Sequence, residues 1–177
     1  MIEQANLSQF SKIMEIYAQA RTFMAQTGNP DQWGTAYPPQ EMILQDIQNG
    51  KCYVNLKDGN ICAVFYFAVE EDPTYAYIEG SWLNNQPYGV IHRIAVGENG
   101  KGTAAECFQF ALERCRNLRI DTHEDNLPMQ NALAKEGFSH RGTIYLANGD
   151  PRLAYDWLGM EKVLVIGCPG GGKSTFA

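Results

Sequence analysis

"VIHRIAVGENGKGTAAECFQFAL", residues 90–112, places a strand, a glycine-containing loop and a helix in immediate succession. β-Branched and apolar residues favour a strand over residues 90–96, and the helical pattern begins at Thr103. The glycines between them let backbone N–H groups face outward, and a helix N-terminus adds partial positive charge. This arrangement suits a phosphate or pyrophosphate, to which Lys101 would add a full charge. A tight strand-to-helix turn that needs glycine only for its geometry explains the same residues equally well.

The hydrophobic periodicity on either side of this stretch predicts an α+β domain. Apolar residues at helical spacing predict helices at residues 10–24, 39–48, 103–116 and 128–135. Strands are predicted at residues 52–56, 61–69, 75–80, 89–96, 118–123, 138–146 and 152–158. Two helices, an antiparallel meander, two strand–helix pairs and a closing hairpin make a mixed sheet that ends near Leu158.

The composition excludes several classes of protein. The 177 residues carry a net charge of −6, which argues against a nucleic-acid-binding protein with a broad basic face. No run reaches the ~18 apolar residues of a membrane span, and "MIEQANLSQF" lacks the pattern of a signal peptide. The five cysteines have no metal-like spacing, and their odd number fits reduced thiols. A cytoplasmic protein with no nucleic-acid or membrane partner is therefore expected.

The last residues carry a second phosphate-binding pattern. "GCPGGGKS", residues 167–174, satisfies Gly-x-x-x-x-Gly-Lys-Ser/Thr and follows a strand-like run at residues 163–166. This stretch resembles the start of adenylate-kinase-like P-loop kinases, but only two residues follow Thr175, so we expect no tight nucleotide binding. We expect a domain at residues 1–158 and a truncated P-loop remnant at 159–177, as in a fragment of a fusion. The remnant's strand could pair with a second copy of the chain, which leaves a homodimer open.

The central stretch also resembles the GNAT family of acyl-CoA-dependent N-acyltransferases. In their motif Arg/Gln-x-x-Gly-x-Gly/Ala, Gly102 and Ala104 match, whereas Asn99 replaces the usual Arg or Gln. Downstream, "DTHEDNLPMQNALAKEGF" and "GTIYLANGDPRLAYDWL" are similar to the family's next strand, helix and closing hairpin. The resemblance covers residues 1–158. It implies a mixed, mostly antiparallel central sheet flanked by helices, with a cleft between the fourth and fifth strands.

The resemblance implies acetyl-CoA as co-substrate. Its pantetheine arm would lie along residues 94–96, its pyrophosphate would rest on the amides of residues 100–104, and Asn126 matches a family asparagine near the cofactor. A backbone N–H near Ile94 or Ala95 would stabilise the developing oxyanion. The expected cofactor-binding residues are Ile94, Ala95, Val96, Asn99, Gly100, Lys101, Gly102, Thr103, Ala104 and Asn126, and no metal site is expected.

His92 is the best local candidate for the base that deprotonates the amine, because an unperturbed histidine has a pKa of ~6.5. Strand alternation predicts that it shares a face with Val90, Ile94 and Val96. Arylalkylamine acetyltransferases, which the stretch resembles, carry a catalytic histidine at this offset. A histidine bonded within a half-buried strand is the alternative. Glu79 is a second candidate base, acting through a water, although a solvated strand residue is the more ordinary interpretation.

One departure from the family concerns the acid that protonates the leaving thiolate. Many members carry a tyrosine where this chain has Leu133, so CoA leaves as the thiolate or another group serves. Tyr145 and Tyr155 in the closing hairpin could reach, although packing is an alternative role for both. Trp33, Tyr37, Tyr75 and Trp82 are candidates for lining an acceptor pocket.

The expected function is transfer of an acetyl group from acetyl-CoA to a primary amine, on a small molecule or a peptide, by direct attack on the thioester. Two alternatives remain at this stage. One is a fragment of a fusion to a P-loop nucleotide kinase, in which the first domain only binds acyl-CoA. The other is an acyl-CoA-binding module without catalysis.

Overall fold

The computed structural model of the chain describes residues 1–158, so the P-loop-like pattern and the predicted boundary at 159 lie outside the described residues. One sheet organises the described part, with the strand order β1-β2-β3-β5-β6-β8-β7-β4. The strands are β1 (Ile2–Gln4), β2 (Cys52–Lys57), β3 (Asn60–Val69), β4 (Glu79–Gly80), β5 (Gly89–Val96), β6 (Asn117–Thr122), β7 (Ser139–Tyr145) and β8 (Pro151–Leu158). The helices are α1 (Phe10–Gln26), α2 (Gln40–Gln48), α3 (Thr103–Arg114) and α4 (Leu127–Glu136).

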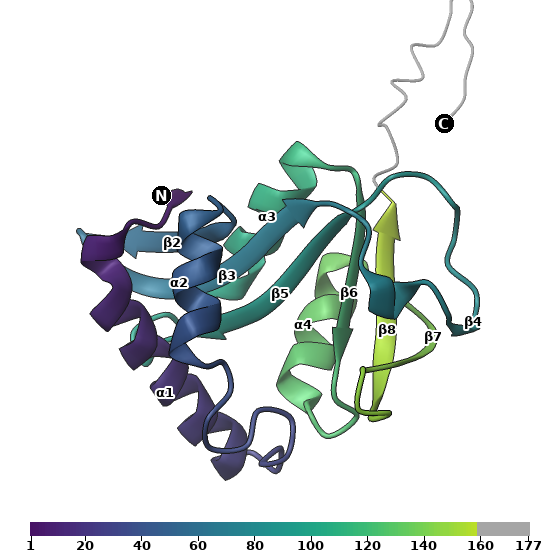
Figure 1. Cartoon of the computed structure of the whole chain (residues 1–177), viewed down its shortest axis with the longest axis horizontal. Coiled ribbons are helices and arrows are strands. Elements are labelled where there is room, and N and C mark those ends of the chain that lie inside the picture. Colours follow the sequence, from purple (N-terminus) through teal and green to yellow (C-terminus); the bar gives the residue numbers. More distant parts are fainter. Residues whose placement is uncertain (159–177) are drawn as a thin grey trace, which may run out of the picture.

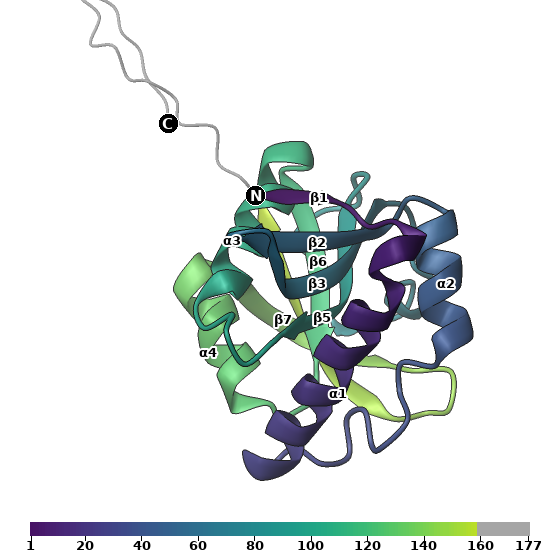
Figure 2. The same cartoon turned by 90° about the vertical axis from the view of Figure 1, so that its left-hand side faces the viewer.

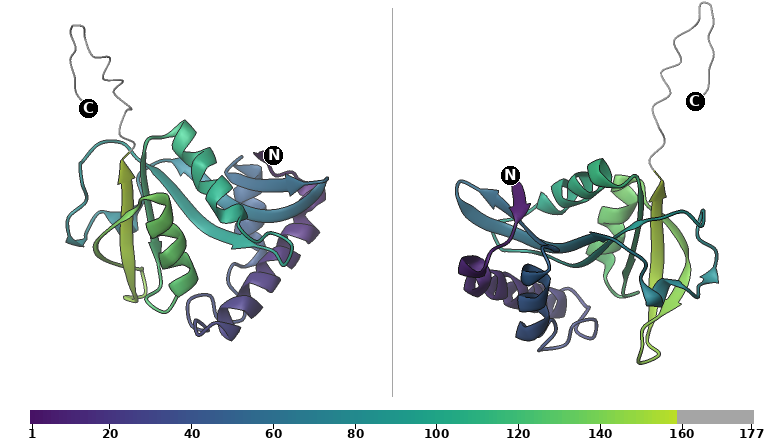
Figure 3. Two further views of the ribbon diagram at one scale, coloured as in Figure 1. Left: turned by 180° about the vertical axis from the view of Figure 1, so that it is seen from behind. Right: turned by 45° about the horizontal axis from the view of Figure 1, so that its top comes forward.

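Helices cover both faces of this sheet (Figures 1, 2 and 3). The N-terminal helices α1 and α2 lie on one face, over β2, β3 and β5, and α3 and α4 lie on the other. Within the described sheet every neighbouring pair is antiparallel except β5 and β6, which are parallel. The predicted α+β class with a mixed, mostly antiparallel sheet is confirmed.

The apolar stripes of the helices build the core. In α1 the buried residues Ile13, Ile16, Tyr17 and Ala20 recur at helical spacing and pack onto β2, β3 and β5. In α3 the buried stripe includes Cys107 and Phe108, which contact the opposite face of the same strands. Cys107 is fully buried inside this cluster and fills part of the core. No helix in the described part of the chain is long and apolar enough to cross a membrane.

One predicted strand is wrong in its extent. The sequence suggested a strand at residues 75–80, but the structure has a 3-10 turn at Pro73–Tyr75 and only the two-residue strand β4. The Asp72 carboxylate accepts a hydrogen bond from the Thr74 amide, and Pro73 occupies the first turn. This capped turn starts a helical geometry, which overrides the β-propensity of the tyrosines that follow.

The two parallel strands separate soon after they meet. β5 and β6 pair only at Gly89 with Leu118 and at Val90 with Arg119, after which they diverge (Figure 1). Beyond that point the facing edges no longer form a ladder, and side chains of both strands line a shared cavity. These are the fourth and fifth strands of the sequence-based count, so the predicted cleft lies between them.

Candidate active site

A β-bulge in β5 shapes the site. Val64 of β3 pairs with Ala95 and Tyr66 pairs with His92, so Phe65 alone lies opposite two residues, Arg93 and Ile94. Arg93 adopts a left-handed backbone conformation with φ of 49°, which is uncommon for a residue with a side chain. A bulge of this kind bends the strand and redirects the side chains that follow it.

Contacts from three elements hold the bulge. The Arg93 guanidinium donates to both carboxylate oxygens of Asp46 in α2, from Nε at 2.9 Å and from Nη2 at 3.0 Å. The Tyr17 hydroxyl of α1 donates to the Arg93 carbonyl at 2.8 Å, and the guanidinium carbon lies 4.6 Å from the centre of the Tyr66 ring. A bidentate pair that is largely buried fixes both position and orientation. The strained residue is thus held by its own side chain and by its own carbonyl.

The bulge corrects the predicted face of His92. Val90 and His92 lie on one side of the sheet, where Val90 belongs to the cluster of Tyr66 and Tyr75, and the His92 ring contacts the same two tyrosines. Ile94, in contrast, belongs to the cluster packed against α3 on the other side, and Val96 packs on that cluster too. Strand alternation therefore predicted the face correctly for Val90 and wrongly for Ile94 and Val96. The extra residue at the bulge shifts the alternation by one.

His92 is bound to a carboxylate that the sequence reasoning did not identify. Its Nε2 lies 2.6 Å from Oδ2 of Asp72, and both side chains are largely buried. Burial alone would raise the pKa of Asp72, but hydrogen bonds from His92 and Thr74, together with the charge of His92, lower it to about 2. Asp72 is therefore ionised at neutral pH. The histidine ring therefore lies against a fixed negative charge, which orients it.

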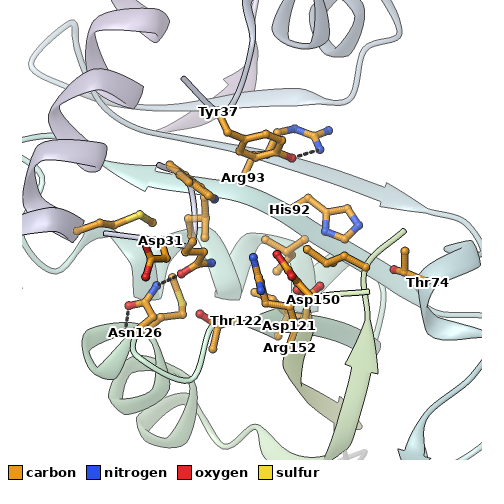
Figure 4. A pocket seen from close by; sticks show the side chains of 18 of the residues that line it. Asp31, Tyr37, Thr74, His92, Arg93, Asp121, Thr122, Asn126, Asp150 and Arg152 are labelled. Carbon is orange, nitrogen blue, oxygen red and sulfur yellow. Dashed lines mark hydrogen bonds between the residues drawn. The ribbon is translucent and has the colours of Figure 1, made fainter. Parts of the chain in front are cut away.

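His92 lines a cavity of about 550 Å³ between the separated strands, called here the His92 cavity. Figure 4 shows its labelled side chains, with His92 and Arg93 entering from β5 and Asp121, Thr122 and Arg152 from the opposite wall. Asp121 Oδ1 accepts a hydrogen bond of 2.6 Å from the Tyr75 hydroxyl, and burial raises the pKa of its carboxyl. Trp33 and Tyr37 line the cavity as predicted for an acceptor pocket. Tyr75 and Trp82 instead line a separate cavity on the far side of Asp72.

A second, more apolar cavity of about 530 Å³ lies along the end of β5 and is called the β5 groove. Side chains of α1, α4 and the loop after β5 line it, including Phe23 and Pro128. Of the residues predicted to bind the cofactor, Ile94, Ala95, Val96, Lys101, Gly102, Ala104 and Asn126 line this groove. Asn99, Gly100 and Thr103 are not among its lining residues.

The loop amides are less available than the sequence suggested. The Gly100 amide donates to the Gly97 carbonyl at 2.9 Å, and the Thr103 amide donates to the Gly100 carbonyl at 2.9 Å. Two amides of the predicted set therefore close the turn, as in the geometric interpretation of the glycines. Lys101, Gly102 and Ala104 remain as the members of the set that line the groove at the start of α3. The prediction that the whole run from residue 100 to 104 presents its amides was wrong.

The His92 cavity and the β5 groove adjoin each other. Four residues line both of them: Met24, Ile94, Asn126 and Met129. Asn126 caps α4 by accepting a hydrogen bond from the Met129 amide, and its own amide group donates to Gln32 in the loop between α1 and α2. The asparagine thus ties together the two elements that flank the junction. A ligand in the groove and a ligand in the cavity would meet beside Ile94.

Residues 11–138 match the acetyltransferase (GNAT) family. The chain belongs to the GNAT family of acetyltransferases. A GNAT acetyltransferase structure from Streptococcus agalactiae 2603 is 32% identical, with a TM-score of 0.83, and the alignment covers 91% of this chain and 96% of that one.

Two more distant structures share the fold. A GNAT acetyltransferase from Listeria monocytogenes 4b F2365 is 18% identical with a TM-score of 0.65, over 88% of this chain and 92% of that one. A ribosomal-protein-alanine N-acetyltransferase from Brucella melitensis is 16% identical with a TM-score of 0.60, over 89% and 99%. A search of curated protein sequences found no significant match.

The other predicted catalytic groups of this GNAT acetyltransferase lie away from His92. The Tyr145 hydroxyl donates to the Glu79 carboxylate at the β4–β7 edge of the sheet, and neither residue lines any of the three cavities described here. Leu133, at the position of the family tyrosine, is fully buried in the α3 cluster, and Tyr155 is buried in the same cluster. The structure therefore does not bring Glu79, Tyr145 or Tyr155 to the site.

Sequence reasoning missed Asp46, Asp72 and Arg152. Asp72 lies in a loop, and only its position before Pro73 marks it, as a turn residue. Asp46 occupies a helix that reads as ordinary and amphipathic, and Arg152 follows a proline at the start of a strand. Their partners are distant in sequence, so no local spacing could identify them. Among residues 1–158, no group of three or more His, Cys, Asp or Glu side chains is arranged to hold a metal ion.

Proposed function

We propose that this chain transfers the acetyl group of acetyl-CoA to a primary amine held in the His92 cavity, by direct attack of the amine on the thioester. One observation carries the proposal. A histidine paired with an ionised aspartate lies in a cavity that adjoins an apolar groove, and the two spaces meet at Ile94. This is the arrangement that proton removal from an amine beside a bound thioester requires.

The β5 groove suits the acyl-CoA arm in the polarity of its lining and in its position beside the His92 cavity. Its wall is largely apolar, formed by residues such as Phe23, Met24 and Val96, and Lys101 at the start of α3 supplies positive charge for a phosphate. Val96 ends β5, so an extended ligand would follow the direction of the strand. When bound, acetyl-CoA supplies the activated acetyl thioester.

His92 accepts the proton of the amine in this proposal. Because Asp72 engages Nε2, the neutral ring carries its proton there, and Nδ1 is the basic nitrogen. Asp72 then stabilises the imidazolium that forms, as the carboxylate does in other histidine-based proton transfers. A backbone N–H of the bulge, at Ile94 or Ala95, would donate to the thioester oxygen as charge develops there.

The leaving thiolate has no acid at the position of the family tyrosine, because Leu133 is part of the core. The His92 imidazolium could serve as the acid instead, because it has gained a proton from the amine in the preceding step. CoA therefore leaves either as the thiolate or with a proton from His92. In both cases no side chain of the closing hairpin takes part.

The test combines cofactor binding with turnover. Acetyl-CoA should raise the melting temperature of the protein, and CoA thiol release should follow when a panel of primary amines is added. His92→Ala should lower kcat by roughly 10²- to 10⁴-fold and leave the acetyl-CoA shift unchanged. His140→Ala is the matched control, because His140 lies on exposed β7 and lines none of the three cavities described here. Full activity of the His92 variant would refute the role of the base, and binding without turnover would indicate an acyl-CoA-binding module.

A further inference from the structure

Arg152 is a buried cation in the wall of the His92 cavity, and among residues 1–158 no carboxylate lies within ion-pair distance of it. The residue is the second of β8 and is 7% exposed. Its Nη1 donates to the carbonyl of its neighbour Pro151 at 2.9 Å, and none of the ion pairs among residues 1–158 includes it. The side chain nevertheless lines the cavity, on the wall across from His92 (Figure 4).

Three other arginines of the sheet, buried or half-buried, are compensated. Arg93 pairs with Asp46, Arg141 pairs with Asp156 at 2.6 Å, and Arg119 lies between the rings of Trp82 and Tyr88, at 4.4 and 4.0 Å. Arg152 differs from all three. A buried guanidinium is expensive unless a hydrogen-bonded anion faces it, which makes an external anion the natural partner.

Asp121 is the nearest internal alternative, because its charge interacts with Arg152 over a distance longer than an ion pair. Its carboxylate already accepts a hydrogen bond from the Tyr75 hydroxyl. No hydrogen bond joins it to the Arg152 guanidinium. The Arg152 guanidinium, with its planar set of donors, is suited to bind a carboxylate with two parallel hydrogen bonds.

We propose that Arg152 binds a carboxylate of the acceptor, so that the acceptor is a free amino acid or a similar amino-carboxylate rather than a simple amine. This inference rests on the proposed function. The amino group would approach His92 from one wall while the carboxylate meets Arg152 on the other. A cavity of about 550 Å³ is adequate for a molecule of this size.

Charge in the cavity supports an acceptor that carries both signs. Four carboxyl groups line it, those of Asp31, Asp72, Asp121 and Asp150, and they attract the ammonium form of the acceptor. A purely cationic diamine would place its second charge against Arg152. A purely anionic ligand would meet four aspartates. An amino-carboxylate would place its ammonium group near the aspartates and its carboxylate near Arg152.

The experiment compares each acceptor with its decarboxylated form. L-Tyrosine with tyramine and L-histidine with histamine are assayed for acetyl transfer by the wild-type protein and by Arg152→Gln. We expect the amino acids to be the better acceptors for wild type. In Arg152→Gln their kcat/KM should fall roughly 10- to 100-fold, the worth of a charged hydrogen bond, while values for the amines change by less than about threefold. Arg152→Lys should restore part of the preference.

Arg114→Gln is the matched control, because Arg114 lies on α3 over Phe110 and lines none of the three cavities described here. Two results would overturn the inference. One is a wild-type preference for the amines. The other is an equal loss for both classes in Arg152→Gln, which would assign Arg152 a structural role beside Asp121.

A binding measurement separates failure of this inference from failure of the proposed function. The same amino acids and amines are added to the CoA-bound protein, and the melting temperature is recorded for wild type and Arg152→Gln. If amino acids raise the melting temperature of wild type but not of Arg152→Gln, Arg152 binds their carboxylate even where no turnover is seen. If acetyl-CoA binds and amines are acetylated but amino acids neither bind nor react, the function holds and the inference is wrong.

Discussion

Replacement of Asp72 by asparagine should destabilise the protein in a way that depends on pH. The pKa of Asp72 is about 2 in the folded protein against 3.8 for an unperturbed carboxyl. At about 1.36 kcal/mol for each pH unit of difference, ionised Asp72 contributes roughly 2 kcal/mol to the free energy of unfolding. Because the folded pKa is the lower one, this contribution is fully present above pH 3.8 and is lost as the pH falls toward 2.

The assay is urea unfolding of wild type and Asp72→Asn at a series of pH values from 7 to 2. The variant should be less stable by about 2 kcal/mol at pH 7, and the difference should narrow below about pH 4 and approach zero near pH 2. Thr74→Val removes only the hydroxyl that donates to Oδ1 at 2.7 Å, so it should show a smaller loss of the same sign. A difference that does not vary with pH, or that stays below about 0.5 kcal/mol at pH 7, would refute the assignment of Asp72 as an ionised partner of His92.

Three further substitutions test other parts of the structure. Gly100→Ala would place a Cβ 2.2 Å from the Cys62 carbonyl oxygen, so it should lower the free energy of unfolding by about 1–3 kcal/mol in urea and weaken the acetyl-CoA thermal shift. Asp46→Asn leaves the Arg93 charge buried without its partner, and we expect a loss of about 3–5 kcal/mol by the same method. Thr122→Val removes a buried hydroxyl that has no hydrogen-bond partner in the structure, so it should raise the melting midpoint, by about 1 kcal/mol in stability; a destabilised Thr122 variant would show that the hydroxyl is satisfied.

The sequence predicted the elements well because their signals are local. The helical stripe of α1 and the continuous apolar run of β3 are patterns within one segment, and both elements were confirmed with only small differences at their ends. The short strand β1 was not predicted, and the misjudged strand at residues 75–80 lies where a side-chain cap at Asp72 competes with β-propensity. Local sequence rules do not decide between a capped turn and a strand here, because the outcome depends on what the following loop can pack against.

The site was less accessible to sequence reasoning because its parts come from distant segments. His92 was identified by its position in a strand, but its partner Asp72 lies on another loop, and Arg152 reaches the cavity from β8. The predicted amide cradle was only half right, since two amides of the loop were needed to close its own turn. Glu79 and Tyr145 were plausible by residue type, and the topology placed them together at the opposite edge of the sheet.

The bulge in β5 lets one short strand line both the His92 cavity and the β5 groove. In a regular strand His92 and Ile94 would share a face, and the base would point into the same space as the residue that borders the cofactor groove. The extra residue at Arg93 turns the chain, so His92 lies with Tyr66 and Tyr75 while Ile94 packs toward α3. Because the bulge holds an L-residue in a left-handed conformation, the fold must stabilise it from outside, and Asp46 and Tyr17 do so from α2 and α1. The N-terminal helices therefore help to shape the strand that carries His92, although neither helix is marked as functional by its sequence.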